Sequence, residues 1–227
     1  TAARMTYTDV SSILTTKPPE LMQKYSDLVS KFELMEQLFH ILNGRRKRRG
    51  SIDFDLPEAE VIIDDAGKVE RIVEAQRNIA HKLIEEFMLL ANETVATYVE
   101  GRGMPCVYRI HEQPDVLKVE EFEEFISGFG YSLAAPPGAV RPRNFQRLLE
   151  KLRGKPDDRP IAFLMLRTMQ KARYAERNLG HFGLAADSYT HFTSPIRRYP
   201  DLIVHRMLRE LRHKGIDMER VEELEVD

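Results

Sequence analysis

The sequence has a single cysteine and no long hydrophobic run. One cysteine in 227 residues, Cys106, excludes a disulfide framework and a zinc site built from several cysteines. No apolar stretch approaches the roughly 20 residues that a membrane-spanning helix needs, and the first residues show no apolar signal-peptide core. We therefore expect a soluble cytoplasmic protein, in a reducing compartment, with no membrane partner.

An excess of charge of one sign is also missing. The chain has 34 Lys and Arg against 36 Asp and Glu, a formal net charge of −2. This balance excludes a uniformly basic nucleic-acid binder but leaves a local basic patch open. Hydrophobic residues make up 42% and charged residues 31%, which is typical of a globular protein with an ordinary core.

The hydrophobic pattern predicts an α+β fold that is mainly helical, with a mixed or antiparallel sheet. Apolar residues at spacings of three and four predict long helices over about 18–42 and 77–98, with Asn43-Gly44 as C-cap of the first. Short β-branched stretches predict a hairpin within 58–74. No interior linker is long enough to separate domains. The remaining predicted elements are a strand at 107–110 and helices at about 116–128, 143–153 and 160–174.

The most informative stretch is 191–206, His-Phe-Thr-Ser-Pro-Ile-Arg-Arg-Tyr-Pro-Asp-Leu-Ile-Val-His-Arg. Ser194 before a proline predicts a helix N-cap, and the free N–H groups of a helix start attract anions. Arg197 and Arg198 would lie in its first turn and could bind phosphate, before Pro200 starts a second helix. The alternative is a capped surface helix whose arginines pair with acids. The residues alone leave both interpretations open.

This stretch closely resembles the signature near the end of the catalytic domain of the ribonuclease II/ribonuclease R family. Further motifs match the family in the same order, so that the resemblance covers essentially residues 4–212. It is closer to ribonuclease R than to ribonuclease II at Arg198, at Pro200 and in the basic run before Ile52. The other matching segments are Arg4-Met-Thr-Tyr7, 77–92 (RNIAHKLIEEFMLLAN), 109–114 (RIHEQP) and 180–184 (GHFGL).

The resemblance implies a processive 3′→5′ exoribonuclease that binds the 3′ end of single-stranded RNA and releases nucleoside 5′-monophosphates by metal-assisted hydrolysis. Arg197 would be the catalytic residue, contacting the scissile phosphate and stabilising the charge that develops there. Phe54 would stack on a base, and Tyr7 and Glu85 would sense the 2′-hydroxyl. Ser194 and Arg198 complete the predicted RNA-binding residues.

Each of these assignments has a plainer alternative in the residues themselves. Phe54 would be a core residue at the edge of the hairpin, and Tyr7 would pack the first helix. Glu85 would pair with Lys82, three residues earlier on the same helix. Glu86, the neighbouring position, is an alternative for the role given to Glu85.

One family feature is missing from the chain, the aspartate cluster D-x5-D-x-D-D. Closely grouped acids are what hold two Mg²⁺ ions at a phosphoryl-transfer site. The acidic pairs present, Asp53-x-Asp55, Asp64-Asp65 and Asp157-Asp158, do not have this spacing. We therefore expect residues 1–227 to be the C-terminal two-thirds of one RNB-type catalytic domain, with no second domain and with its Mg²⁺ ligands upstream. The isolated chain would then be inactive, and the complete enzyme monomeric.

Three further interpretations stay open. The chain could be a non-catalytic RNA-binding or protein-interaction module of the same fold. A metal site could be formed by His181, His191 and His205, although their spacing is not compact, and Cys106 could be a nucleophile. The five cations at 45–49 could contact RNA or form a solvated helix end.

Overall fold

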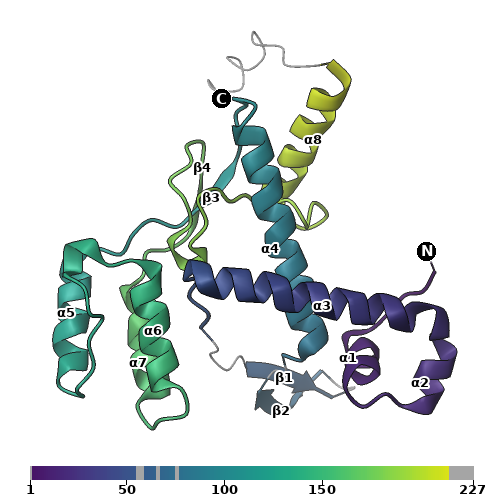
Figure 1. Cartoon of the computed structure of the whole chain (residues 1–227), viewed down its shortest axis with the longest axis horizontal. Coiled ribbons are helices and arrows are strands. Elements are labelled where there is room, and N and C mark those ends of the chain that lie inside the picture. The colour runs from purple at the N-terminus through teal and green to yellow at the C-terminus, as the bar shows by residue number, and fades with distance from the viewer. Residues whose placement is uncertain (1, 55–58, 65–66, 75–76, 215–227) are drawn as a thin grey trace. The chain divides into compact units, whose positions relative to one another are not determined.

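The computed structural model describes residues 2–54, 59–64, 67–74 and 77–214 and confirms a mainly helical α+β fold with antiparallel strand pairs (Figure 1). The predicted residues Asp55 and Asp65 lie outside the described part of the chain. The elements are α1 (Tyr7–Thr15), α2 (Pro19–Lys24), α3 (Ser26–Arg49), β1 (Ala59–Ile63), β2 (Val69–Glu74), α4 (Ile79–Glu100), β3 (Tyr108–Ile110), α5 (Val116–Ser127), α6 (Pro142–Leu152), α7 (Asp158–Thr168), β4 (Arg173–Ala175) and α8 (Tyr199–Lys214).

The chain divides into two compact units, each described by itself below. Unit 1 comprises Thr1–Gly44 and Asp55–Phe87, and unit 2 comprises Arg45–Phe54 and Met88–Asp227. The predicted hairpin forms in unit 1 as the antiparallel strands β1 and β2, with an irregularity between Ile62 and Ile63. The core of unit 1 is formed by side chains from its helices. The buried residues of this core are Ile13, Leu14, Phe32, Phe39 and Leu83.

The first long helix differs from the prediction at both ends. It is interrupted at Tyr25, which has a non-helical backbone, and α3 then runs through Gly44 and the whole basic run to Arg49. Asn43 is not a cap, because its side-chain amide donates to Glu86 Oε1 over 2.9 Å. The helix ends instead at Gly50, whose φ of +102° suits glycine and reverses the chain.

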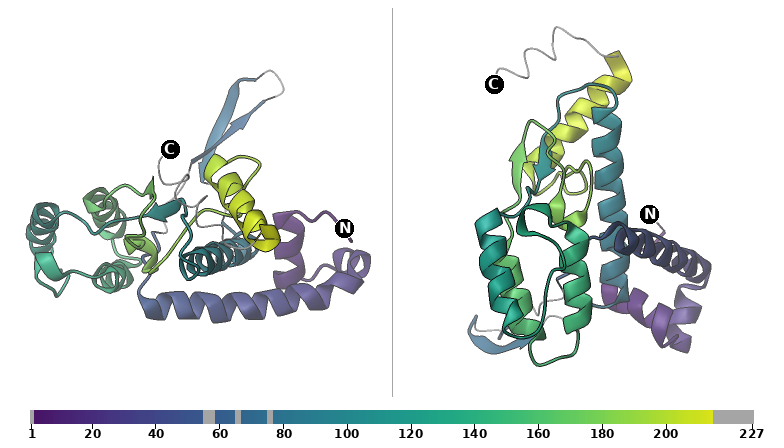
Figure 2. Two further views of the ribbon diagram at one scale, coloured as in Figure 1. Left: turned by 90° about the horizontal axis from the view of Figure 1, so that it is seen from above. Right: turned by 60° about the vertical axis from the view of Figure 1, so that its left-hand side comes forward.

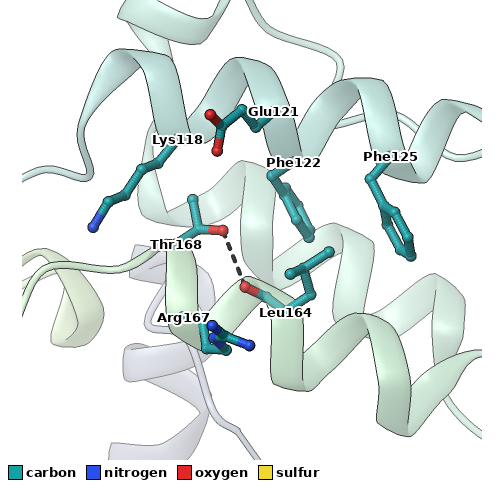
Figure 3. Close-up of a pocket in the computed structure, with 7 residues that line it drawn as sticks. All are labelled: Lys118, Glu121, Phe122, Phe125, Leu164, Arg167 and Thr168. Carbon is teal, nitrogen blue, oxygen red and sulfur yellow. Dashed lines mark hydrogen bonds between the residues drawn. The ribbon is translucent and has the colours of Figure 1, made fainter.

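In unit 2, the helices α5, α6 and α7 pack around one apolar core (Figures 1 and 2). Asp115 caps α5, accepting hydrogen bonds from the backbone N–H groups of Leu117 and Lys118. A pocket opens between α5 and α7, and Figure 3 shows that none of the predicted site residues lines it. The fully buried members of this core are Val119, Ile126, Phe145, Leu152 and Met165.

A second part of unit 2 is built from α4, α8 and a short strand pair. The predicted strand is confirmed as β3, which pairs antiparallel with β4. The predicted helix over 160–174 is too long, because Met169 takes an extended backbone after Thr168 and the chain goes on into β4. Val99 of α4, Ile110 of β3 and Val204 of α8 are almost completely buried together. This core fixes where the chain enters α8.

Candidate functional site

The stretch before α8 forms a turn rather than the predicted helix start. The N–H groups of Arg197 and Arg198 both donate to the carbonyl oxygen of Ser194, over 3.2 and 3.0 Å. α8 begins only at Tyr199, because Pro200 has no N–H with which a helix could continue across this point. The predicted N-cap role of Ser194 is therefore wrong. The backbone N–H of Ser194 instead donates a hydrogen bond to a side-chain partner in α8.

That partner is Asp201, a completely buried carboxylate in the first turn of α8. Its Oδ1 accepts a hydrogen bond from the Ser194 backbone N–H at 2.7 Å and another from Arg198 Nη2 at 2.7 Å. The Arg198 side chain is 18% exposed, so most of this ion pair is removed from water. A buried charge requires such a partner, and Arg198 is therefore committed to Asp201 rather than free for a ligand.

Arg197, the neighbour, has the opposite character. Its side chain is exposed, and Nη2 donates to Ser194 Oγ over 3.4 Å. In the part of the chain that the structure describes, Arg197 forms no ion pair with a carboxylate. The guanidinium of Arg197 is thus exposed to solvent, while the guanidinium of Arg198 stabilises the turn through its buried pair with Asp201. A guanidinium placed in this way can bind an anionic oxygen with several N–H donors.

The segment that leads into the turn is anchored to two helices. Asn92 of α4 is fully buried, and its Oδ1 accepts a hydrogen bond from the Phe192 N–H while its amide donates to the Tyr189 hydroxyl. The ring of His205 on α8 stacks on the ring of Phe192 with a centroid separation of 4.1 Å, and its Nε2 lies 2.9 Å from the Phe192 carbonyl oxygen. These contacts hold the segment before Arg197 in one conformation.

Three histidines lie behind this segment, and burial keeps them neutral. Burial lowers the pKa of His181 to about 3, and burial together with the nearby Arg198 lowers the pKa of His191 to about 4. Burial also lowers the pKa of His111, whose ring meets that of His181 edge-on at 5.1 Å. His191 Nδ1 lies 2.8 Å from the Tyr174 hydroxyl, so its ring is held by a hydrogen bond.

The geometry supports neither a histidine metal site nor a Cys106 nucleophile. Among the described residues, no three His, Cys, Asp or Glu side chains come close enough to hold a metal ion, and His181, His191 and His205 make the separate contacts given above. Cys106 is buried, and burial raises the pKa of its thiol to about 11. A thiol that stays protonated at neutral pH is a poor nucleophile.

In unit 1, Tyr7 and Glu85 are linked through the first turns of α4. Tyr7 is 47% exposed, and its ring stacks on His81 with centroids 4.0 Å apart and planes 18° apart. His81 Nδ1 lies 2.8 Å from Asn78 Oδ1, which also accepts hydrogen bonds from the first N–H groups of α4. His81 precedes Glu85 by one helical turn. Sequence reasoning missed this positioning of Tyr7 by His81.

The adjacent acids Glu85 and Glu86 differ sharply in environment. Glu85 has a side chain that is 34% exposed and pairs with Arg77, not with the expected Lys82. Glu86 is 4% exposed and accepts the hydrogen bond from Asn43. Of the two, only Glu85 is accessible to a ligand.

Phe54 belongs to unit 2, where its half-buried ring packs against the apolar core formed with Ile52. Phe54 thus packs as a core residue, but against the core of α5, α6 and α7 and not at the edge of the hairpin. The structure therefore brings Ser194, Arg197 and Arg198 together on one turn, and it places Tyr7 and Glu85 in unit 1. Asp201 was missed in the sequence because a carboxylate in the first turn of a helix usually reads as a helix-dipole partner.

Comparison with known proteins identifies relatives over almost the whole chain. The family model described as "RNB domain" matches residues 1–214. Ribonuclease R of Aquifex aeolicus is 48% identical over 219 residues, which cover 96% of this chain and 31% of that protein. Ribonuclease R of Escherichia coli is 42% identical over 211 residues, covering 92% of this chain and 26% of that protein. The chain thus spans about a third or less of the length of these relatives.

Solved structures show the same fold. The Mycoplasma genitalium RNase R in complex with ribose methylated single-stranded RNA matches with a TM-score of 0.87 at 27% identity, covering 98% of this chain and 35% of that one. Yeast Ssd1, described as a pseudonuclease, matches with a TM-score of 0.72 at 22% identity, covering 98% and 27%. In addition, no helix in the described residues is long and apolar enough to cross a membrane.

Proposed function

We propose, from the premise that this chain belongs to the RNB-domain family of ribonucleases, that its complete protein is a processive 3′→5′ exoribonuclease acting on single-stranded RNA. The products would be nucleoside 5′-monophosphates. The observation that carries the proposal is the exposed Arg197, which has no carboxylate partner among the described residues and lies on a turn locked by Asp201.

Arg197 would act on the phosphate being cleaved. Hydrolysis of a phosphodiester increases the negative charge on the phosphate oxygens in the transition state, and a fixed guanidinium stabilises that charge. The contacts made by Ser194 and Arg198 would keep the guanidinium in place, because they hold the turn in the absence of RNA. A donor that is already oriented costs no reorganisation when the charge develops.

Tyr7 and Glu85 would contact the ribose of nucleotides near the 3′ end. The hydroxyl of the half-exposed Tyr7 and the accessible Glu85 carboxylate are groups that can hydrogen-bond to a 2′-hydroxyl, which distinguishes RNA from DNA. Phe54 remains the proposed base-stacking residue, and the exposed part of its half-buried ring would supply the stacking face.

Mg²⁺ is part of the proposal, but its ligands are not assigned to this chain. The described residues contain no group of three potential ligands, so they do not fit the metal site that the family implies. We assign the ligands to an aspartate cluster upstream, and we expect the isolated chain to be inactive for this reason. A cytoplasmic location and a monomeric enzyme complete the proposal.

Product analysis tests the proposal directly. The complete protein would be incubated with single-stranded RNA carrying a 5′ label, and separately with RNA carrying a 3′ label. We expect the 3′ label to appear at once in nucleoside 5′-monophosphate, while the 5′-labelled RNA stays long until a short end product forms. Release of internal oligonucleotides would contradict the proposal. Binding of RNA without any release would instead identify a non-catalytic RNA-binding module.

A further inference from the structure

The basic run at 45–49 separates into two groups once its contacts are known. Arg46 is buried, and it donates to Ser51 Oγ over 3.2 Å and pairs with Asp53 at 3.6 Å. Arg49 forms a bidentate pair with Glu93, in which Nη1 donates to Oε2 over 2.8 Å and Nη2 donates to Oε1 over 2.6 Å. These two arginines hold the end of α3 within unit 2.

The other three cations of the run have no such role. Arg45, Lys47 and Arg48 are exposed, and none forms an ion pair with a carboxylate in the residues that the structure describes. Exposed cations at a helix end gain only a little stability from the helix dipole. A solvated helix end therefore explains why exposed cations can lie at this position. It does not explain why three of them occur together.

The fold places a second row of cations beside them. The side-chain amide of Gln146 on α6 donates to the carbonyl oxygen of Lys47 over 2.8 Å. A Cβ added at Gly50 would lie 2.9 Å from the Cβ of Arg143, so the end of α3 meets α6 almost backbone to backbone. Figure 1 shows this meeting of α3 and α6. Both segments belong to unit 2.

The exposed face of α6 is itself basic. Arg143, Arg147 and Lys151 recur every four residues, which places them in a row on one face at intervals of about 6 Å. All three are exposed, and none has a carboxylate partner in the described part of the chain. The opposite face of α6 is buried. The helix has one acidic residue, Glu150, which is exposed and follows Arg147 by three residues, so it lies beside the row of cations.

We infer that these six cations form one surface that binds the phosphate backbone of RNA outside the cleavage site. The basic surface consists of Arg45, Lys47, Arg48, Arg143, Arg147 and Lys151. Its charge is positive in a chain whose net charge is −2, and it has no base-stacking aromatic, so it would bind without regard to sequence. The inference rests on the proposed function only in taking RNA as the polyanion.

Salt dependence of RNA binding tests the inference. The logarithm of the binding constant for single-stranded RNA falls with the logarithm of salt concentration by about 0.7 for each phosphate contact. Changing Arg45, Lys47 and Arg48 to glutamine together should therefore make the slope shallower by about 2, and so should changing Arg143, Arg147 and Lys151. Binding of polyadenylate by the complete protein would be measured in EDTA, so that no hydrolysis is needed.

A matched control removes three exposed cations elsewhere in unit 2, Lys118, Arg167 and Lys171. We expect this control variant to keep the wild-type slope of the salt dependence. We also expect the reduction of the slope in the two surface variants to disappear when the RNA is a trinucleotide. An equal loss in the control would reduce the effect to net charge and overturn the inference.

Two further results would also overturn it. One is an unchanged slope in both surface variants. The other is an unchanged RNA slope together with lost binding of polyglutamate, which would identify a surface for acidic proteins. Because every readout is binding, failure of the inference is distinct from failure of the proposed nuclease activity.

Discussion

The two adjacent arginines of the turn, Arg197 and Arg198, have the same side chain and different tasks. Arg198 pairs with the buried Asp201, while Arg197 remains exposed. The sequence Arg-Arg does not reveal which of the two faces solvent, because that depends on where α8 begins. The resemblance to the ribonuclease family selected Arg197, and the geometry supports that choice through the partner that Arg198 already has.

The Asp201 carboxylate should be important for stability as well as for the turn. Changing Asp201 to Asn leaves Arg198 buried without a countercharge, and breaking a buried pair in this way typically costs about 3–5 kcal/mol. Urea unfolding of the chain would measure the loss. As a control, Asp115→Asn changes the exposed cap of α5 to a residue that caps equally well, and it should alter the unfolding free energy little. Equal effects of the two substitutions would contradict the role given to Asp201.

Local patterns predicted individual elements well and their ends less well. The hairpin, β3, and the helices α4, α5 and α6 were all predicted, because each has a clear period of apolar residues or a clear cap. The C-cap at Gly44 was wrong, since a hydrogen bond from Asn43 to Glu86, 43 residues away, decides what Asn43 does. β4 was missed because it is three residues long and pairs with a distant strand.

The predicted site showed the same division. Arg197, Tyr7 and Glu85 came from motifs. Asp201 follows Arg198 by only three residues, but its hydrogen bond from the Ser194 N–H depends on how the turn folds, and His81 contacts a tyrosine 74 residues away. Glu85 and Glu86 could not be told apart by spacing, because only the packing of α4 shows which of the two is buried.

The buried histidines behind the turn should make stability depend on pH. In the unfolded chain His181 and His191 bind protons near pH 6.5, while in the folded chain their pKa values are about 3 and about 4. The unfolded state therefore binds more protons below about pH 6.5, and the unfolding free energy should fall as the pH decreases through that value. Above about pH 7 these two groups should contribute no pH dependence.

Urea unfolding at a series of pH values would measure this effect. Near pH 5.5 we expect His181 and His191 together to take up about two protons on unfolding, in addition to the contribution of His111, and we expect the total to be reduced by about one in His191→Gln. An unfolding free energy that is constant between about pH 5.5 and 7.5 would show that these histidines are not held neutral.

For the whole molecule, the net charge is close to zero, whereas the structure shows local clusters of exposed cations. A net charge of −2 is the sum of 34 cations and 36 acids over the whole chain, and these cations include the exposed Arg197 and the six-residue basic surface in unit 2. Average charge therefore excluded a uniformly basic protein but could not show where cations gather. Because the chain spans 31% of the length of its Aquifex aeolicus relative, activity is properly tested on the complete protein.

We propose above that Arg197 stabilises the transition state of RNA hydrolysis. The most direct test is the single-turnover rate of nucleotide release by the complete protein carrying Arg197→Ala, with RNA affinity measured in parallel and Arg167→Ala as an exposed-arginine control. We predict a rate lower by about 10²–10³-fold, with affinity nearly unchanged and the control close to wild type. A normal rate per bound RNA together with a collapse of affinity would show that Arg197 binds RNA and does not stabilise the transition state.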